Sequence, residues 1–146
     1  MATIKEGKHT IIVLGKGFSA AHSDAFDSDE PLHGHNYSVE VEVESDELKD
    51  GMVMDFRALK KLMNSICKEL DHKTIIGKRD VSREENGLLF CGEYRIPKKH
   101  AVVLPYDRAT CERLSEYFFS RLEKEAKGLV SVRVDEYEGA GARFSR

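Results

Sequence analysis

A stretch of strict alternation between residues 33 and 44 constrains the fold more than any other part of the sequence. One parity carries two histidines, a tyrosine and three valines, while the other carries a glycine, small polar residues and three glutamates. Side chains that repeat at every second residue leave the same face of a β-strand. The stretch therefore predicts a strand with one buried and one solvent-facing side, and His33 and His35 continue the buried row.

The two histidines at this strand end suggest a metal site. His33 and His35 leave one face, and Gly34 between them adds no bulk. His22 ends an apolar stretch at residues 18–22, and the ten-residue connection that follows can bring it opposite the pair. Three imidazoles suit zinc best, and three protein ligands leave a fourth tetrahedral position open for water or substrate. The alternative is three ordinary polar histidines at a strand end, but buried histidines need partners, which a metal supplies.

Periodicity predicts the other main elements. Residues 10–14 and 18–22 form strands separated by a bulge at Gly15-Lys16-Gly17. A helix follows Asp55 as its N-cap and buries an apolar stripe; residues 73–77 are its exit. A second helix runs from Thr110 to a stop at Gly128, and a last strand covers residues 129–137. The first helix's stripe consists of Phe56, Leu59, Leu62, Met63, Ile66 and Leu70, and the second buries Leu114, Tyr117, Phe118 and Leu122.

Residues 78–108 are harder to interpret. The apolar runs at 88–91 and 101–104 indicate two strands, which allows a β-hairpin. The whole chain of 146 residues then fits one α+β domain, an antiparallel sheet with two helices on one face.

Composition excludes several classes of function. The formal charge of -3 gives no basic footprint for nucleic acid. The sequence contains no apolar run long enough for a membrane span and no apolar leader segment, so we expect a cytoplasmic protein that binds neither nucleic acid nor membrane. The three cysteines lack a paired spacing, which argues against a disulfide framework or a thiolate zinc site.

Candidate acid and base groups lie near the histidines in sequence. Glu30 stands three residues before His33, within an otherwise solvated acidic loop, and Asp71-His72 closes the first helix. The alternative for Asp71-His72 is a mere capping pair, because the macrodipole favours a histidine near a helix C-terminus, and adjacent side chains on a helix diverge, which argues against a direct Asp-His bond. Glu136 continues the apolar row of the last strand; either it meets a donor-rich group or the strand emerges there into water.

Four short motifs occur along the chain in order: Phe18-Ser19-Ala20-Ala21-His22, Leu32-His33-Gly34-His35-Asn36-Tyr37, Gly51-Met52-Val53-Met54-Asp55-Phe56 and Leu70-Asp71-His72. Their order and spacing resemble the 6-pyruvoyltetrahydropterin synthase and 6-carboxytetrahydropterin synthase family. The resemblance implies a single pterin-binding domain over residues 1–146 with the tunnelling fold (T-fold), whose subunits join into trimeric barrels stacked as a homo-hexamer.

The resemblance also implies roles for individual residues. The histidines that match His22, His33 and His35 bind zinc in the family, and the pair that matches Asp71 and His72 belongs to a catalytic relay. The family's pterin is anchored by a glutamate that matches Glu136. Thr110 and Glu112 resemble a Thr-x-Glu motif near the pterin pocket, although Ala109 stands where proline is common.

One departure from the family pattern bears on the reaction. Synthases of the family carry a cysteine a few residues before the His-Gly-His, and residues 23–32 contain none. Glu30-Pro31-Leu32-His33-Gly34-His35 is similar to a subgroup with glutamate in that place, which cleaves dihydroneopterin or its triphosphate to 6-hydroxymethyl-7,8-dihydropterin. We therefore expect a zinc-dependent retro-aldol lyase with Glu30 as base. The alternatives are 6-carboxy- or 6-pyruvoyl-tetrahydropterin synthase activity and a non-catalytic zinc-binding protein.

Overall fold

The long strand β3 (His33–Ser45) is the centre of the main sheet. The computed structural model describes residues 7–146. Along β3 the predicted alternation is confirmed, because Val39, Val41 and Val43 are buried and the glutamates between them face outward. β1 (His9–Leu14) and β2 (Phe18–His22) pair one after the other along one edge of β3; β9 (Leu129–Tyr137) pairs along its other edge and β10 (Ala140–Ser145) follows β9.

The predicted bulge between the first two strands is present and determines which way His22 points. Leu14 pairs with Glu40 and Phe18 pairs with Tyr37, so three residues of one strand lie opposite two of the other. The extra residue changes the inward-facing parity from odd in β1 to even in β2. Gly17 makes this possible with a φ of +77°, at a point where a Cβ would lie 2.3 Å from the Tyr37 carbonyl oxygen.

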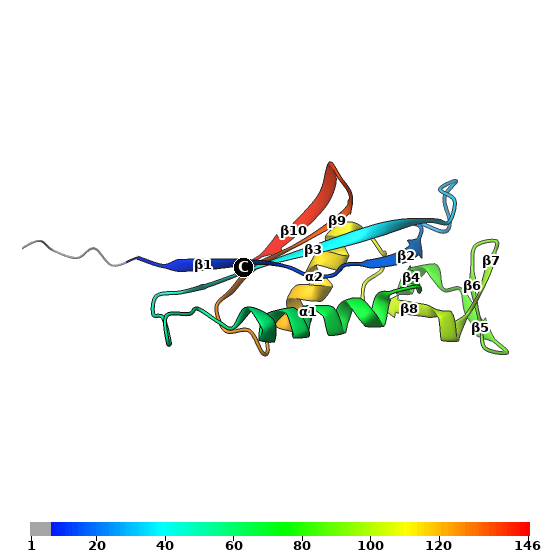
Figure 1. Cartoon of the computed structure of the whole chain (residues 1–146). Coiled ribbons are helices and arrows are strands. Elements are labelled where there is room, and N and C mark those ends of the chain that lie inside the picture. The colour runs from blue at the N-terminus through cyan, green and yellow to red at the C-terminus, as the bar shows by residue number, and fades with distance from the viewer. Residues whose placement is uncertain (1–6) are drawn as a thin grey trace, which may run out of the picture.

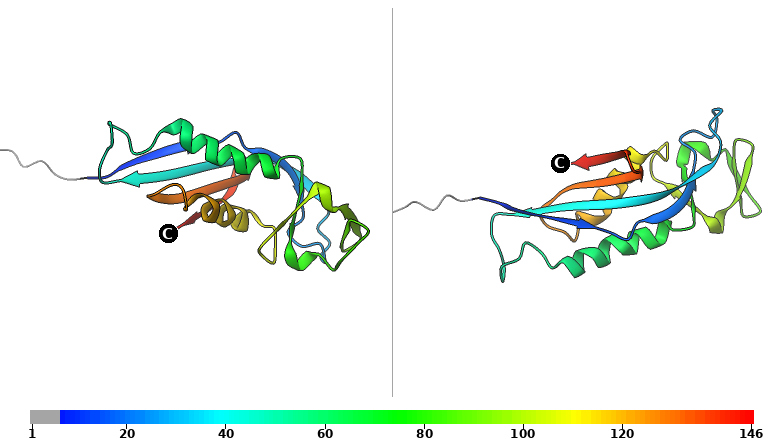
Figure 2. Two further views of the ribbon diagram at one scale, coloured as in Figure 1. Left: turned by 90° about the horizontal axis from the view of Figure 1, so that it is seen from below. Right: turned by 45° about the horizontal axis from the view of Figure 1, so that its top comes forward.

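Both helices pack on the valine face of the sheet (Figures 1 and 2). α1 (Phe56–Leu70) has the predicted Asp55 N-cap, whose side chain accepts a hydrogen bond from the backbone N–H of Arg57. Its stripe is buried from Leu59 onward except at Leu62, which is partly buried. Phe56 is 55% exposed because it lies at the helix start, beyond the edge of the core. The expected core role of Phe56 is therefore wrong.

α2 (Cys111–Leu122) starts after Thr110 as predicted but ends six residues before Gly128. Tyr117 is only half-buried, while Leu114, Phe118 and Leu122 are in the core. Gly128 instead joins the turn to β9: its carbonyl accepts the N–H of Glu44 at 2.9 Å, and a Cβ there would meet the Glu44 carbonyl. The glycine thus marks where the chain rejoins the sheet.

The region that was hard to interpret forms two separate structures. β4 (Thr74–Gly77), which was expected to be only an exit segment, and β8 (Ala101–Leu104) extend the main sheet from β2 in parallel pairings. β5 (Arg83–Glu85), β6 (Leu88–Cys91) and β7 (Tyr94–Pro97) make a small antiparallel sheet of their own. The strands expected at 88–91 and 101–104 exist, but they belong to different sheets and form no hairpin together.

The expected α+β architecture with two helices on one sheet face is confirmed, with the parallel pairs at one edge as an addition. The short 3₁₀ helices η1 (Lys78–Asp80) and η2 (Lys98–His100) connect the two sheets. Within residues 7–146, every helix is too short or too polar to cross a membrane.

Candidate metal centre and acid–base site

The three predicted metal ligands come together on the inner face of β2 and β3. His22 lies directly opposite His33 in the strand register, and His35 is two residues further along β3. Ring centroids are 4.7 Å apart for His22 and His33, 5.1 Å for His22 and His35, and 4.8 Å for His33 and His35. One nitrogen of each ring lies within 4.8 Å of the others. We call these three residues the histidine cluster.

Backbone carbonyls orient two of the rings. The Nδ1 atom of His22 lies 3.0 Å from the carbonyl oxygen of Ala109, and Nδ1 of His33 lies 2.8 Å from that of Pro31. A carbonyl can only accept, so each Nδ1 is the N–H nitrogen and each Nε2 carries the free lone pair. This is how metal-binding histidines are usually fixed in their tautomer and orientation.

Two nitrogens of the cluster fit a metal ion. Nε2 of His22 and Nε2 of His35 are buried, and no atom of the described residues forms a hydrogen bond with either. Burial lowers the pKa of His35, with Glu136 opposing the shift, so this imidazole is held in its neutral form. Neutral buried nitrogens without a protein partner are costly unless an external group binds them. Three nitrogen donors suit zinc.

Two carboxylates border the cluster. The Glu136 carboxylate reaches both buried nitrogens, with Oε1 3.8 Å from Nε2 of His22 and Oε2 3.8 Å from Nε2 of His35. Asp24, expected to be only part of a solvated loop, is half-exposed and lies 3.6 Å from Nδ1 of His22. Burial raises the pKa of Asp24, and the Glu30 carboxylate adds to the rise. The only sequence signal for Asp24 is its position two residues after His22, a predicted metal ligand.

Glu30 lies at the rim of the cluster on the loop between β2 and β3. Its Oε1 atom is 3.8 Å from Nε2 of His33. Its Oε2 atom accepts the backbone N–H of Asp24 at 2.7 Å and lies 3.3 Å from the Ser23 hydroxyl. The Glu30 side chain is one-third exposed. The hydrogen bonds to Oε2 fix the carboxylate through that oxygen and leave Oε1 open.

None of the three cysteines is suited to act as a base. Cys67, Cys91 and Cys111 are buried free thiols on three different elements. Burial raises the pKa of Cys67 and of Cys91 to about 11. Burial together with nearby Glu136 raises the pKa of Cys111 to about 12. A thiolate base needs a depressed pKa and access to the substrate, and these thiols have neither.

Asp71 and His72 pair with each other but stand apart from the cluster. Oδ2 of Asp71 lies 2.9 Å from Nδ1 of His72, and Oδ1 accepts the backbone N–H of Ser19. The expected divergence does not arise, because α1 ends at Leu70 and His72 has a φ of +60°. The hydrogen bond from Ser19 and the pairing with His72 lower the pKa of Asp71.

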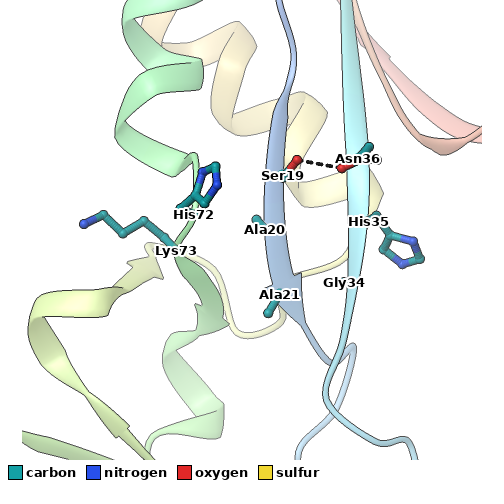
Figure 3. A pocket seen from close by; sticks show the side chains of 8 residues that line it. All are labelled: Ser19, Ala20, Ala21, Gly34, His35, Asn36, His72 and Lys73. Atoms are coloured by element: carbon teal, nitrogen blue, oxygen red, sulfur yellow. Dashed lines mark hydrogen bonds between the residues drawn. The ribbon is translucent and has the colours of Figure 1, made fainter.

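Figure 3 shows His72 beside β2 and the His35 ring on the far side of β3. His72 is 84% exposed and lines an open pocket together with His35 of the cluster, Lys73, Ser19 and Asn36. The last two have the opposite parity to the cluster and so face away from it. Within residues 7–146, no hydrogen bond or ion pair joins His72 to Glu30 or to the cluster.

The start of α2 lies next to the cluster. Thr110 caps the helix by accepting the N–H of Arg113, and the preceding Ala109 carbonyl holds His22. Glu112 is an exposed residue of the first helical turn. Thr110 therefore directly follows the residue that contacts His22, while Glu112 projects from the helix into solvent.

Comparisons with known proteins identify the family of the chain. A family model described as 6-pyruvoyl tetrahydropterin synthase matches residues 11–146. A dihydroneopterin monophosphate aldolase from Pyrococcus furiosus is 43% identical over 82 residues, which cover 56% of this chain and 71% of that protein. A putative 6-carboxy-5,6,7,8-tetrahydropterin synthase from Methanocaldococcus jannaschii is 32% identical over 130 residues, which cover 79% of this chain and 80% of that protein.

Solved structures show the same relationship. The chain superimposes on a Plasmodium vivax 6-pyruvoyltetrahydropterin synthase with a TM-score of 0.85 and 28% identity, covering 96% of this chain and 98% of that one. An equally similar structure is a variant of that protein in which a glutamate, described as a catalytic residue, is replaced by alanine. The match of the family model over almost the whole chain, together with these relatives, shows that the chain belongs to the 6-pyruvoyl tetrahydropterin synthase family.

Proposed function

We propose that the chain is a zinc-dependent lyase that cleaves the side chain of 7,8-dihydroneopterin, or of a phosphate ester of it, to 6-hydroxymethyl-7,8-dihydropterin. The observation that carries the proposal is the Glu30 carboxylate, 3.8 Å from His33 at the rim of the cluster, where synthases of the family have a cysteine. The name of the Pyrococcus furiosus relative, an aldolase, supports the reaction. The Plasmodium vivax protein, which is named a 6-pyruvoyltetrahydropterin synthase, has a catalytic glutamate and supports a catalytic role for Glu30.

The histidine cluster would hold the zinc through His22, His33 and His35. When bound, the ion supplies a positive charge that holds two adjacent hydroxyl oxygens of the substrate side chain and stabilises the negative charge formed on proton loss. The protein's part is to keep the three imidazoles neutral and oriented, which the Ala109 and Pro31 carbonyls do for two of them.

Glu30 would act as the general base. Its Oε1 takes the proton of the C2' hydroxyl, the C2' oxygen becomes a carbonyl, and the C1'–C2' bond breaks. The electron pair of that bond moves into the dihydropterin ring, and a proton returned to C1' completes the 6-hydroxymethyl product. The other product is a two-carbon aldehyde that retains any phosphate carried on the terminal carbon.

Glu136 would anchor the pterin. A carboxylate accepts two parallel N–H bonds from an amino-pyrimidinone edge, and Glu136 faces the cluster from β9. Thr110, next to the Ala109 carbonyl that orients His22, would border the pterin, and the solvent-facing Glu112 would lie at the outer edge of that site. In this arrangement, the pterin edge would take over the Glu136 carboxylate that now lies beside the two imidazoles.

We further propose that a second copy of the chain supplies the Asp71–His72 relay, within a homo-hexamer. Within one chain, His72 lies beside β2 while the His35 ring lies on the far side of β3, which favours a relay supplied by another chain. His72 is exposed and already oriented by Asp71, as a group that reaches into a neighbouring subunit would be.

The alternative within the family is a 6-carboxy- or 6-pyruvoyl-tetrahydropterin synthase, favoured by the name of the Methanocaldococcus jannaschii relative. That route removes carbon-bound protons, a task for which the family uses a thiolate. The buried, high-pKa thiols of this chain are poorly suited to it. The absence of an accessible thiol therefore favours the lyase.

Product identification tests the proposal. The zinc-loaded protein is incubated separately with 7,8-dihydroneopterin, its monophosphate and its triphosphate, and products are identified by mass spectrometry. We expect 6-hydroxymethyl-7,8-dihydropterin and a two-carbon aldehyde from at least one of them. A 6-carboxy or 6-pyruvoyl product would show that the synthase alternative is correct.

Chelation separates the lyase from a non-catalytic zinc protein. Removal of metal from an open catalytic site should abolish turnover while the circular dichroism spectrum is retained, and added zinc should restore activity. A metal that only holds strands together would instead be needed for folding, so the spectrum would be lost together with the metal.

A further inference from the structure

The loop that carries Glu30 has no regular structure of its own beyond turns, yet it is held from outside at several points. We call residues 23–32 the Glu30 loop. We propose that Arg108, through a two-pronged contact with Asp27, positions this loop and thereby holds the Glu30 carboxylate at the histidine cluster. The proposal deepens the proposed function and rests on Glu30 as the catalytic base.

The contact between Arg108 and Asp27 has the geometry of a fork. Nη1 of Arg108 lies 3.2 Å from Oδ1 of Asp27, and Nη2 lies 3.3 Å from Oδ2. Two parallel N–H···O bonds fix direction as well as distance, unlike a single flexible ion pair. The pairing lowers the pKa of Asp27, so the carboxylate is ionised throughout the neutral range.

Arg108 is itself anchored in the interior by Asp80. Nη1 of Arg108 lies 2.6 Å from Oδ1 of Asp80, whose side chain is 1% exposed. The same Asp80 oxygen accepts the backbone N–H of Phe26 at 3.4 Å, which ties the Glu30 loop to η1 directly. The guanidinium therefore connects the Glu30 loop to a buried carboxylate, a support that an ion pair between two exposed groups lacks.

The segment around Arg108 also controls a metal ligand. The next residue, Ala109, provides the carbonyl that orients His22. The preceding Asp107 packs tightly on β4, since a Cβ on Gly77 would lie 2.3 Å from its carbonyl oxygen. Residues 107–109 thus contact both the imidazole of His22 and the Glu30 loop. This shared support fixes the distance between His22 and Glu30.

The small sheet supplies the remaining support. The hydroxyl of Tyr94 accepts the N–H of Leu32 at 3.0 Å, and its ring stacks edge-on against Phe26 at 5.7 Å. Phe26 is buried in a second core with residues of β6 and β7, namely Leu89, Cys91 and Ile96. In Figures 1 and 2 the Glu30 loop and this sheet lie at the same end of the molecule.

The principal test compares Asp27→Asn with Asp29→Asn in the full-length, zinc-loaded protein. Both aspartates are exposed residues of the same loop, but only Asp27 contacts Arg108. Amide hydrogen exchange over residues 23–32 reports the anchoring, because the N–H groups of Asp24, Phe26 and Leu32 all donate hydrogen bonds. We expect faster exchange in Asp27→Asn and wild-type exchange in Asp29→Asn.

Activity then reports the positioning. Asp27→Asn should lower kcat roughly three- to tenfold, with KM, zinc content and thermal midpoint unchanged, because only the alignment of the base is disturbed. Arg108→Lys keeps a charge beside Asp80 but loses the fork, so it should lower kcat similarly. The double variant should be no worse than either single one, since all three break the same contact.

Each outcome decides the proposal. Unchanged exchange in Asp27→Asn, or faster exchange with an unchanged kcat, would overturn it, as would additive losses in the double variant. If the wild-type protein turns over no dihydroneopterin compound, the proposed function fails, and the exchange comparison still shows whether Arg108 anchors the loop.

Discussion

At the scale of single residues, the two oxygens of Glu30 have different surroundings. Oε2 is engaged by the Asp24 N–H and the Ser23 hydroxyl, while Oε1 faces His33 across 3.8 Å. One oxygen therefore fixes the carboxylate and the other remains open to a substrate proton. This division is what a general base needs, because a base that must reorient before each transfer loses rate.

Replacing Glu30 by Gln removes the proposed base and keeps the shape of the side chain. We expect kcat to fall by about a hundredfold or more, the lower range of what a positioned base contributes, with zinc content unchanged. Steady-state kinetics and metal analysis measure both. Glu93→Gln, an exposed carboxylate of the small sheet, is the control and should behave as wild type. A Glu30→Gln enzyme that keeps more than about a tenth of wild-type kcat would rule out this role.

The cysteines give a second prediction at this scale. Because burial raises the pKa values of Cys67 and Cys91 to about 11 and that of Cys111 to about 12, almost no thiolate exists at pH 8. Iodoacetamide at pH 8 should therefore modify none of the three in the native protein and all three in guanidinium chloride, as counted by intact mass. Rapid alkylation of one thiol in the native protein would show an accessible, reactive cysteine and would support the synthase alternative.

Part of the site could be predicted from residue spacing alone. His33 and His35 share a strand face, which fixes their proximity before any fold is known. The place of His22 depends on one extra residue at the bulge, which Gly15 and Gly17 signal in the sequence. Asp24 could not be predicted, because the path of a loop with few periodic residues depends on contacts made elsewhere in the chain.

At the scale of elements, length determines which strands a sequence reveals. β3 has thirteen residues and six inward positions, enough for a clear period, whereas β4 to β8 have three or four residues each. β10 presents alanines and a single phenylalanine on its half-buried side, a weak pattern. The short strands exist because neighbouring backbones offer hydrogen bonds and a second core, which are properties of the tertiary structure.

Gly92 tests how closely the small sheet supports the Glu30 loop. It has a φ of +58°, and a Cβ there would lie 2.5 Å from the Phe26 carbonyl oxygen. Gly92→Ala should lower the free energy of unfolding by about 1–2 kcal/mol because of the left-handed backbone, and by a further amount because Phe26 is displaced. The displacement should also lower kcat. Denaturant unfolding and steady-state kinetics measure the two effects.

Gly87→Ala is the matched control for this prediction. Gly87 has a φ of +75° in the same sheet, but a Cβ there would meet no atom within 4 Å. Gly87→Ala should therefore lose only the stability due to the left-handed backbone, and its kcat should be unchanged. Equal stability losses and equal kcat values for the two variants would mean that the packing of Gly92 against Phe26 does not position the Glu30 loop.

At the scale of the whole molecule, the sheet separates the two halves of the expected catalytic machinery. Glu30, Glu136 and the histidine cluster lie on one face of β2 and β3, and the Asp71–His72 pair lies beside β2 toward the other. The sequence alone suggested that all these residues form one site within a chain. It could not show otherwise, because the face of the sheet on which a side chain lies is decided only when the sheet has formed. A symmetric assembly can bring the two halves together, since each copy then presents both to its neighbours.

Mixing two inactive variants tests this arrangement. Chains with Glu30→Gln retain His72, and chains with His72→Gln retain Glu30; His72 is exposed, so its replacement should not affect folding. If each site combines Glu30 of one chain with His72 of another, random one-to-one co-assembly leaves about a quarter of the sites intact, and activity should return to about that fraction. Co-expression with two affinity tags yields the mixed assemblies. Glu30→Gln chains mixed with chains carrying both substitutions should stay inactive, since no site then retains a base. If the first mixture also stays inactive although mixed assemblies form and each variant alone is inactive, the two groups act within one chain and the proposed shared site is wrong.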